Sequence, residues 1–344
     1  MITYRKAHAD DIQASLDLAL RVLAQFHAPD CEQKAVSNYF TARFKDERYL
    51  NGFKSGQYPM FVALDGESIV GMITGDRGTG ALSTIAEMAV DGAYHRQGIA
   101  TELMNRMVCE LKLQGADKIT LKALPYGLPF YLTYGFIATD EKQRSQSGFD
   151  FIPMAYEPNE IWDVLDINGN KTGRYHERGR PMAAGDYHLC VHVWKHNGKG
   201  EWLIDKRAKK SPDDIHDGKW ETTGGAAIAG DDSLTAALRE TNEELGLDLD
   251  PTKGVLFRRF AREGFYGHTY LMDVWVFEYD CAIEDIRFQK SETCEAMWAT
   301  ADKIRELMKN NEFFSDVELY FDEMDISNAI VHSATLYVRK DITR

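Results

Sequence analysis

Residues 225–247 read GAAIAGDDSLTAALRETNEELGL, and the spacing of apolar, acidic and glycine residues in this stretch decides the fold of its half of the chain. Apolar side chains recur every three or four residues, which predicts a helix from about Ser233 to Leu245. Gly246 follows the last turn, as expected of a glycine that ends a helix. One face of this helix collects Leu234, Ala237, Leu238, Thr241 and Leu245.

Three glutamates, Glu240, Glu243 and Glu244, stand at positions i, i+3 and i+4 of this helix, within an arc of about 100°. Carboxylates this close repel one another. A hard divalent cation removes the repulsion and prefers oxygen ligands, so the spacing predicts a metal site with these three side chains as ligands. The alternative is a solvated acidic face. It is disfavoured because Arg239 is placed to hold a glutamate in orientation.

This stretch closely resembles the Nudix box, Gly-x5-Glu-x7-Arg-Glu-U-x-Glu-Glu-x-Gly-U, in which U is a bulky aliphatic residue. Asp231 replaces the first glutamate and Thr241 replaces an aliphatic residue, whereas the metal-binding glutamates are intact. The resemblance covers about residues 158–326. It implies a Nudix α/β/α sandwich that cleaves a nucleoside diphosphate linked to another group, using Mg²⁺ or Mn²⁺.

The resemblance also implies roles for single residues. The metals would neutralise the bridging oxygens and activate water. The base that takes the water's proton stays open among the box glutamates, Glu292 and Glu295, and our catalytic candidates from this set are Glu243 and Glu295. Arg207 is equally compatible with a phosphate contact and with a surface ion pair.

The residues around the box suggest one branch of this family and two alternatives to hydrolysis. Tyr187-His188 and residues 218–220 (GKW) look like the branch that contains isopentenyl diphosphate isomerases. Those enzymes use a cysteine shortly after the tryptophan, and residues 221–225 (ETTGG) contain none, so hydrolase is favoured. A Nudix domain that only senses a ligand and regulates the first half is the second alternative. His188 and His192, on one face of a predicted strand, are interpreted as core or edge histidines rather than ligands.

A second informative stretch is residues 87–102, EMAVDGAYHRQGIATE, which predicts a strand, a short loop and a helix that begins near Gly98. The first N–H groups of a helix lack partners and its dipole is positive there, so such a loop binds a pyrophosphate. Gly98 permits close backbone approach, and the small Ala100 keeps the helix entrance open. On these grounds alone, an ordinary helix start and a phosphate site are equally compatible.

Residues 95–100 (HRQGIA) resemble the GNAT acetyltransferase signature, Arg/Gln-x-x-Gly-x-Gly/Ala after a strand. The match holds at Gly98 and Ala100, while His95 stands where arginine or glutamine is usual. Residues 130–136 (FYLTYGF) are similar to the family's Phe-Tyr-x-x-x-Gly-Phe segment. The resemblance covers residues 1 to about 156 and implies the GNAT fold and the transfer of acetyl from acetyl-CoA to an amine.

By this resemblance Tyr131 is the acid that protonates the leaving thiolate and Glu87 is the base. Backbone groups of Met88 and Val90 would pair with the pantetheine arm. The plainer interpretations are an exposed strand residue for Glu87 and core packing for Tyr131. Two prolines in residues 124–129 (LPYGLP) interrupt a usually regular helix, so the acceptor amine stays open. The predicted coenzyme loop comprises His95, Arg96, Gln97, Gly98, Ile99 and Ala100.

Composition bounds the remaining possibilities. The net charge of −14 lies mostly beyond residue 158, and so acidic a surface disfavours nucleic acid as a partner. The five cysteines are scattered without a Cys-x-x-Cys pair, which fits a reducing cytoplasm. We find no signal peptide and no apolar run of membrane-spanning length, so we expect a cytoplasmic protein without a membrane partner. The expected partners are a small-molecule amine and a nucleotide-type substrate.

A chain of 344 residues is long for one core, so two mixed α/β (α+β) domains are expected. The clearest seam assigns residues 1–156 to the acetyltransferase domain and 157–326 to the Nudix domain. Residues 327–344 form a tail of unknown role. We also expect a helix over about 32–46 and a loop over 173–186.

Overall fold

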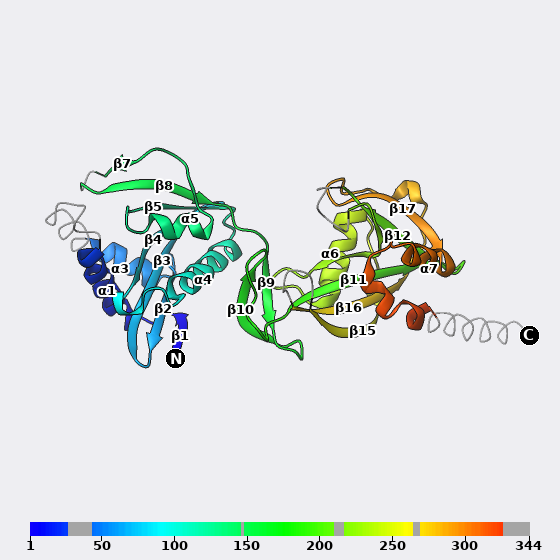
Figure 1. Ribbon diagram of the computed structural model, residues 1–344, viewed down its shortest axis with the longest axis horizontal. Coiled ribbons are helices and arrows are strands. Elements are labelled where there is room, and N and C mark those ends of the chain that lie inside the picture. The colour runs from blue at the N-terminus through cyan, green and yellow to red at the C-terminus, as the bar shows by residue number, and fades with distance from the viewer. Residues whose placement is uncertain (27–42, 146–147, 210–216, 264–268, 326–344) are drawn as a thin grey trace, which may run out of the picture. The chain divides into compact units, whose positions relative to one another are not determined.

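The computed structural model describes the chain with five gaps, at residues 27–42, 146–147, 210–216, 264–268 and 326–344. The tail predicted from residue 327 lies outside the described residues, as does most of the helix predicted over 32–46. The described chain divides into two compact units (Figure 1). The first contains Met1–Ile161 and Tyr175–Arg180, and the second contains Trp162–Arg174 and the chain from Pro181 onward.

The first unit is built on a mixed sheet in the order β1-β2-β3-β4-β5-β8-β6, with β7 paired to β8. Neighbouring strands are antiparallel except for β4 and β5, which are parallel and pair only from Leu82 to Thr84. The strands are β1 (Ile2–Lys6), β2 (Met60–Asp65), β3 (Ser68–Thr79), β4 (Leu82–Val90), β5 (Lys118–Ala123), β6 (Ile137–Ala138), β7 (Gln143–Arg144) and β8 (Asp150–Tyr156).

Helices cover both faces of this sheet. On one face, α4 buries Leu103 and Met107 against Ile73 and Ile119. On the other face, α1 buries Leu16 and other apolar side chains against β2 and β3. The helices are α1 (Asp11–Phe26), α3 (Glu47–Lys54), α4 (Ile99–Leu113), α5 (Leu128–Tyr134) and the 3₁₀ turn η2 (Gly92–Tyr94).

The second unit has a sheet in the order β13-β12-β11-β16-β15, to which β14 adds beside β11 and β17 beside β12. A separate two-stranded sheet, β9 with β10, precedes it in the sequence, and residues 161 and 175–177 of these two strands belong to the first unit. The strands are β9 (Ile161–Leu165), β10 (Lys171–Glu177), β11 (His188–His196), β12 (Glu201–Arg207), β13 (Trp220–Glu221), β14 (Thr223–Ala226), β15 (Gly254–Glu263), β16 (Thr269–Glu278) and β17 (Thr293–Thr300).

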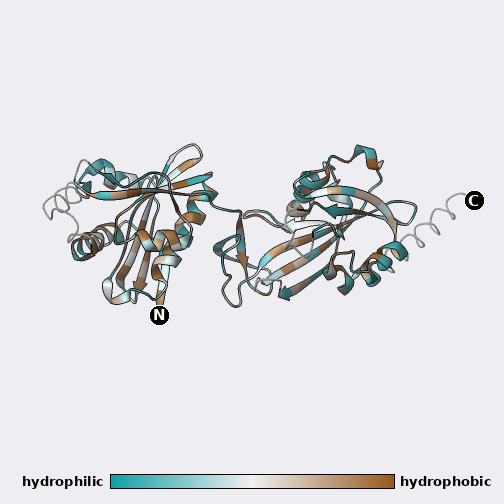
Figure 2. Cartoon of the chain, turned by 45° about the horizontal axis from the view of Figure 1, so that its top comes forward, coloured by the Kyte–Doolittle hydropathy of each residue, from teal (hydrophilic) through white to brown (hydrophobic). Residues whose placement is uncertain are grey.

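The second sheet is also sandwiched between helices, as the predicted α/β/α architecture requires. Val191 and Val193 of β11 pack under α6, whereas Trp194 and Trp202 face α7 and η6. Brown strands run through the middle of each unit in Figure 2. The remaining elements are α6 (Ser233–Leu245), α7 (Ala301–Lys309) and the 3₁₀ turns η3 (Pro251–Lys253), η5 (Ile283–Asp285) and η6 (Ser315–Leu319).

The loop predicted over 173–186 is wrong in its first part, because residues 173–177 belong to strand β10. The segment shows no alternation of apolar and polar residues, and its five residues from Lys171 to Tyr175 are exposed. Pairing with β9 therefore creates this strand, rather than a buried face that a sequence pattern could reveal. None of the described helices is long and apolar enough to cross a membrane.

Candidate active sites

Helix α6 starts and stops where its sequence predicts. The Asp232 side chain caps the first turn by accepting a hydrogen bond from the Thr235 N–H at 2.7 Å. Gly246 ends the helix in the left-handed conformation, with φ of 66°. Ala236, Ala237 and Leu245 of the helix are fully buried. Of the three glutamates, Glu244 is also buried, Glu240 is half-buried and Glu243 is exposed.

Arg239 binds the acidic residues around it. Its Nε lies 3.0 Å from Asp231 Oδ2, so the shorter aspartate still reaches the guanidinium. Its Nη1 lies 2.9 Å from both Glu240 Oε1 and Glu243 Oε2. A fourth contact, from Nη2 to the Ala226 carbonyl, connects the helix to β14. The prediction that Arg239 orients a glutamate is confirmed.

Gly225 lies directly against the Glu240 carboxylate. A Cβ atom added to Gly225 would lie 2.5 Å from the Glu240 carboxyl carbon, so this carboxylate would have to move. The close approach brings the backbone of β14 against Glu240 of α6. Glycine at this position therefore permits a single compact site formed by a strand and a helix.

Glu244 is a buried carboxylate that receives no side-chain hydrogen bond from any described residue. Its side chain is 9% exposed, and Oε2 is buried without a partner. Burial raises the pKa of Glu244 well above its usual value, and the nearby charges of Asp205, Glu221 and Glu240 raise it further. Such an oxygen favours a bound cation, because an uncompensated buried charge is costly.

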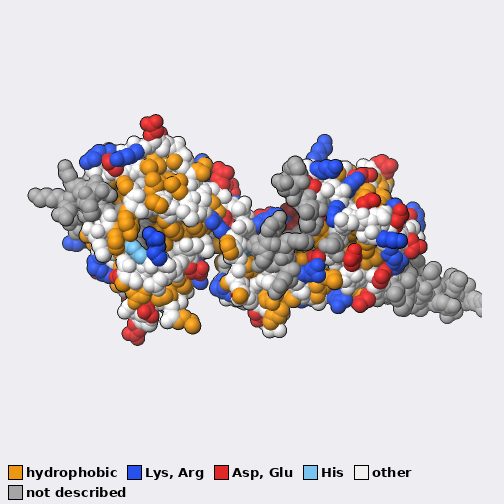
Figure 3. Space-filling model, in the orientation of Figure 1, with side chains coloured by type: hydrophobic (Ala, Val, Ile, Leu, Met, Phe, Trp, Pro, Cys, Tyr) orange, Lys and Arg blue, Asp and Glu red, His pale blue; other side chains and the backbone are white. Residues whose placement is uncertain are grey.

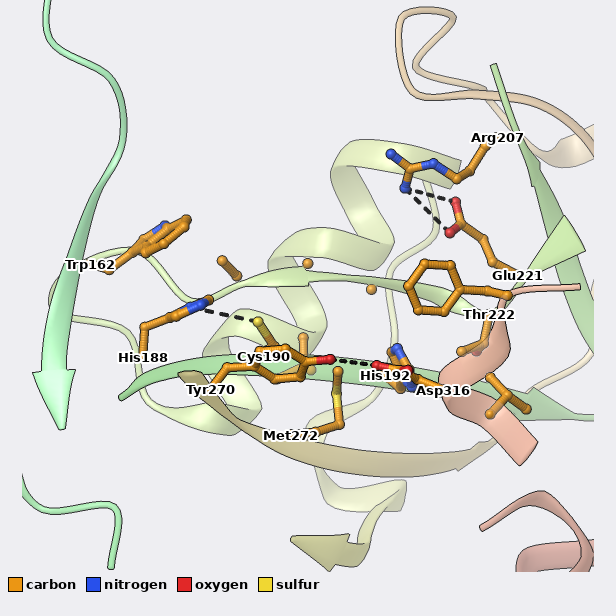
Figure 4. Close-up of a pocket in the computed structure, with 16 residues that line it drawn as sticks. Trp162, His188, Cys190, His192, Arg207, Glu221, Thr222, Tyr270, Met272 and Asp316 are labelled. Carbon is orange, nitrogen blue, oxygen red and sulfur yellow. Dashed lines mark hydrogen bonds and ion pairs between the residues drawn. The ribbon is translucent and has the colours of Figure 1, made fainter. Parts of the chain in front are cut away.

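A cavity of about 290 Å³ opens beside β14 and β11 (Figure 4). One end is lined by Arg207 and Glu221, which form an ion pair at 3.3 Å. Burial raises the pKa of Glu221 to about 8, against the opposing effect of Arg207. At the other end, the Trp162 and His188 rings stack with centroids 4.1 Å apart.

His188 and His192 project from the same face of β11 and both line this cavity. His192 is 7% exposed, and its Nδ1 lies 2.7 Å from the Tyr320 hydroxyl. Burial lowers the pKa of His192 to about 4, so the ring is neutral at physiological pH. These contacts are those of core histidines, which also form one wall of the cavity.

The candidate bases on the later segment lie apart from the cavity wall. The Glu295 carboxylate on β17 is 57% exposed and lies 3.3 Å from Lys206 Nζ. Glu292 precedes that strand, and its negative charge contributes to the raised pKa of Glu221. Neither residue is among the described residues that line the cavity.

In the first unit, helix α4 begins at Gly98 in the left-handed conformation, with φ of 81°. Arg96 also has a positive φ, of 62°, which is uncommon for a residue with a side chain. The first intrahelical bond runs from the Glu102 N–H to the Gly98 carbonyl. The N–H groups of Ile99, Ala100 and Thr101 therefore precede the helical ladder, at the positive end of the dipole.

The β5-facing edge of β4 is open next to this turn. Asp91 N–H donates to the Val70 carbonyl of β3. Antiparallel pairing alternates, so the backbone groups of Met88 and Val90 point away from β3. His95 Nε2 lies 2.8 Å from the Val90 carbonyl oxygen, so the unusual residue of the loop already engages that acceptor.

Glu87 is held on the buried side of β4. It is 8% exposed, so the alternative of an exposed strand residue is wrong. Its Oε2 accepts hydrogen bonds from the Tyr49 hydroxyl at 2.6 Å and from the Thr74 hydroxyl. Its Oε1 lies 3.4 Å from Arg43 Nε. The three partners fix the carboxylate in one position.

Tyr131 packs in the core next to Phe130 and Phe136 and is half-buried. Burial raises the pKa of its hydroxyl to about 12. The group therefore stays protonated at neutral pH, as a proton donor must. Its side chain is both part of the core and chemically suited to the predicted role.

Comparisons with known proteins match the two units separately. The model of the acetyltransferase (GNAT) domain matches residues 27–158, and that of the NUDIX domain matches residues 186–318. An uncharacterized Nudix hydrolase of Listeria monocytogenes is 36% identical over 157 residues, which are 45% of this chain and 88% of the relative. A Listeria innocua relative is 33% identical over 155 residues, with the same coverage.

The chain belongs to the Nudix hydrolase family. A GNAT acetyltransferase domain precedes the Nudix domain, so the protein is an enzyme that joins the two. One similar solved structure is PaiA N-acetyltransferase from Thermoplasma acidophilum in complex with coenzyme A. It is 18% identical to this chain, with a TM-score of 0.40, and the match covers 46% of this chain and 99% of that one. The MutT protein from Methanosarcina mazei is similar at 22% identity and a TM-score of 0.36, over 44% and 97%.

The Nudix domain carries the oxygen donors that a divalent cation prefers. Among the described residues, no three carboxylate, imidazole or thiol groups already converge on one point. The reason is visible at Arg239, which holds Glu240 and Glu243 by its own guanidinium. The donor-free Oε2 of Glu244 shows that the residues present fit a cation.

Three buried polar residues of the Nudix domain escaped the sequence analysis. Lys195, Asp205 and Thr223 are all 0% exposed. Lys195 Nζ donates to Thr223 Oγ1 at 2.5 Å, and Thr223 Oγ1 donates to Asp205 Oδ2 at 2.7 Å. Burial lowers the pKa of Lys195 to about 8. A lysine within the apolar strand VHVWK was the available signal, because a charged residue on a buried face needs a partner.

Proposed function

We propose that the chain is a bifunctional enzyme. Its first domain transfers acetyl from acetyl-CoA to a small-molecule amine, and its second hydrolyses a nucleoside diphosphate conjugate with Mg²⁺ or Mn²⁺. The proposal takes residues 1–156 and 157–326 as the two domains. It requires no nucleic acid and no membrane, and a cytoplasmic location is part of it.

The hydrolase assignment rests chiefly on Glu244, a buried carboxylate without a donor among other acids. Glu240, Glu243 and Glu244 are the proposed metal ligands. Bound metal would neutralise phosphate oxygens and activate water. Gly225 brings the β14 backbone close, and Arg239 orients Glu240 and Glu243.

The base of the hydrolase is proposed from a small set. Glu243 is half exposed, at 50%, and can turn from Arg239 towards a substrate. Glu295 is exposed as well and would have to leave Lys206. Replacing each by glutamine and comparing the pH dependence of hydrolysis identifies the base, because only loss of the base removes the acidic limb.

In the acetyltransferase, the N–H groups after Gly98 and the loop from His95 to Ala100 would bind the coenzyme pyrophosphate. The open edge at Met88 and Val90 would bind the pantetheine arm. Glu87 would accept the amine proton as the nitrogen attacks the thioester carbonyl. A carbon–nitrogen bond forms, the carbon–sulfur bond breaks, and Tyr131 protonates the departing thiolate.

Two measurements test the proposal. Phosphate-containing products are assayed from a panel of nucleoside diphosphate conjugates with Mg²⁺, with Mn²⁺ and with a chelator. Metal-dependent hydrolysis supports the enzyme, whereas ligand binding without turnover supports the sensing alternative. Calorimetry with acetyl-CoA tests the other domain, where binding in the micromolar range is expected. No heat with excess acetyl-CoA would refute it.

A further inference from the structure

Lys195 is a buried cation beside two buried carboxylates. It extends from β11 on the face that packs under α6, two residues beyond Val193. The charges that act on it most strongly are those of Asp205 and Glu244. An ammonium group has three N–H donors and normally pairs with a carboxylate when it is removed from water. Lys195 should therefore compete for Glu244.

The observed contacts show that this competition is avoided. Among the described residues, Thr223 Oγ1 is the one hydrogen-bond partner of Lys195 Nζ. Thr223 in turn donates to Asp205, so its hydroxyl has a fixed direction and cannot donate to Lys195's other neighbours. Glu244 Oε2 stays without a partner, although a cation lies within electrostatic range.

We propose that Thr223 and Asp205 hold the Lys195 ammonium away from Glu244, so that Glu244 stays free for a divalent cation. The inference rests on the proposed metal-dependent function of Glu240, Glu243 and Glu244. Thr223 and Asp205 are positioning residues, since they act on the cation only through Lys195 and Glu244. Lys195 is a tethered counter-ion that limits the repulsion between Asp205 and Glu244.

The arrangement predicts that Mn²⁺ affinity falls in one kind of variant and rises in another. Asp205→Asn and Thr223→Val release Lys195, which then pairs with Glu244 and blocks it. The Mn²⁺ dissociation constant should rise about 10–100-fold, as for other residues that support metal ligands. Lys195→Met removes a nearby positive charge that repels the incoming cation, and the Mn²⁺ dissociation constant should fall roughly tenfold. A role limited to structural support would weaken Mn²⁺ binding in all three variants.

The experiment measures free Mn²⁺ by electron paramagnetic resonance during titration of the full-length protein. Thr223→Ser retains the hydroxyl and should restore most of the affinity lost in Thr223→Val. Thr241→Val is the matched control, because Thr241 is equally buried and its hydroxyl donates, within the described chain, only to the Ala237 carbonyl. All six tryptophans lie in the second unit, so tryptophan fluorescence during urea unfolding verifies that this unit is folded in each variant.

The outcomes separate the inference from the function on which it rests. Wild-type Mn²⁺ affinity in folded Asp205→Asn and Thr223→Val overturns the inference alone. Weaker Mn²⁺ binding in Lys195→Met also overturns it. If Lys195→Met fails to fold, the difference in Mn²⁺ affinity between Thr223→Val and Thr223→Ser tests the inference, and equal affinities overturn it. If wild type and Glu243→Gln bind Mn²⁺ identically, the proposed metal site and this inference both fail.

Discussion

Helix α4 begins with backbone N–H groups that carry no formal charge, whereas helix α6 ends in three glutamates that do. The anion site proposed at the α4 turn uses backbone donors next to Gly98, so it would need no rearrangement to bind an anion. At the α6 site, Glu240 and Glu243 contact Arg239, while Glu244 Oε2 has no donor within the described part of the chain. On the proposed function, the acetyltransferase site would be complete in the protein alone, whereas the hydrolase site would be completed by a cation.

The charge distribution fits this difference. In the one face shown in Figure 3, acidic and basic side chains are interspersed over the second unit, so the visible surface has no single-sign field. The acidic residues next to the proposed metal site are instead in the interior of the unit: Asp205, Glu221 and Glu244. Changes of charge should therefore affect α6 strongly, and changes of backbone geometry should affect α4.

The largest effect is expected from Glu243→Gln, which removes one proposed ligand charge without changing shape. Metal-dependent hydrolysis should fall at least about 10³-fold, since a metal site supplies several kcal/mol of transition-state stabilisation. Glu306→Gln, an exposed glutamate on α7, is the control and should retain full activity. Product release at the wild-type rate from the Glu243 variant would refute the metal assignment.

Tyr131→Phe should lower kcat for acetyl transfer about 10²-fold, because the leaving thiolate loses its proton donor. The KM for acetyl-CoA should change little, since the proposed coenzyme contacts are made by the backbone. Steady-state kinetics of the full-length protein measure both constants. Tyr175→Phe, an exposed tyrosine of the same unit, provides the comparison. An unchanged kcat in Tyr131→Phe would assign that residue to core packing only.

His192 should make the stability of the second unit depend on pH. Its folded pKa of about 4 lies below the ordinary value of 6.5, so the unfolded chain binds a proton more readily. Its contribution is complete above pH 6.5 and is lost as pH falls towards 4, by about 3 kcal/mol in total. Urea midpoints followed by tryptophan fluorescence at pH 8, 6 and 4.5 measure the loss. His192→Asn should flatten this part of the profile, and an equal slope in both proteins would contradict the assignment.

Gly98→Ala should have the smallest effect and should separate backbone geometry from stability. An added Cβ meets no atom within 4 Å, but the left-handed backbone is strained by about 1–2 kcal/mol. Acetyl-CoA affinity should fall about tenfold as the turn relaxes. Gly115→Ala, with φ of +95° and equally open space at the other end of α4, carries the same strain. Calorimetry should show normal affinity in Gly115→Ala, and equal losses in both variants would mean that the turn does not bind the coenzyme.

The predictions from sequence held where the signal was local. Three correct predictions involve residues within a few helical turns of one another: the limits of α6, the end of the helix at Gly246 and the ion pair of Arg239 with Glu243. The part of β10 from residue 173 to residue 177 was missed because only pairing with β9 orders it. Glu221 and Asp205 were missed because an acidic residue in a short strand has no periodic signature, and burial alone makes it unusual.

The sequence by itself determined both domain families and the spacing of the glutamates, because helix periodicity and glycine positions act over neighbouring residues. Only the tertiary structure decided which charges meet. Lys195, Asp205, Thr223 and Glu244 come from three strands and a helix. Their contacts follow from sheet order and from the burial that removes water, and neither can be read from one segment alone.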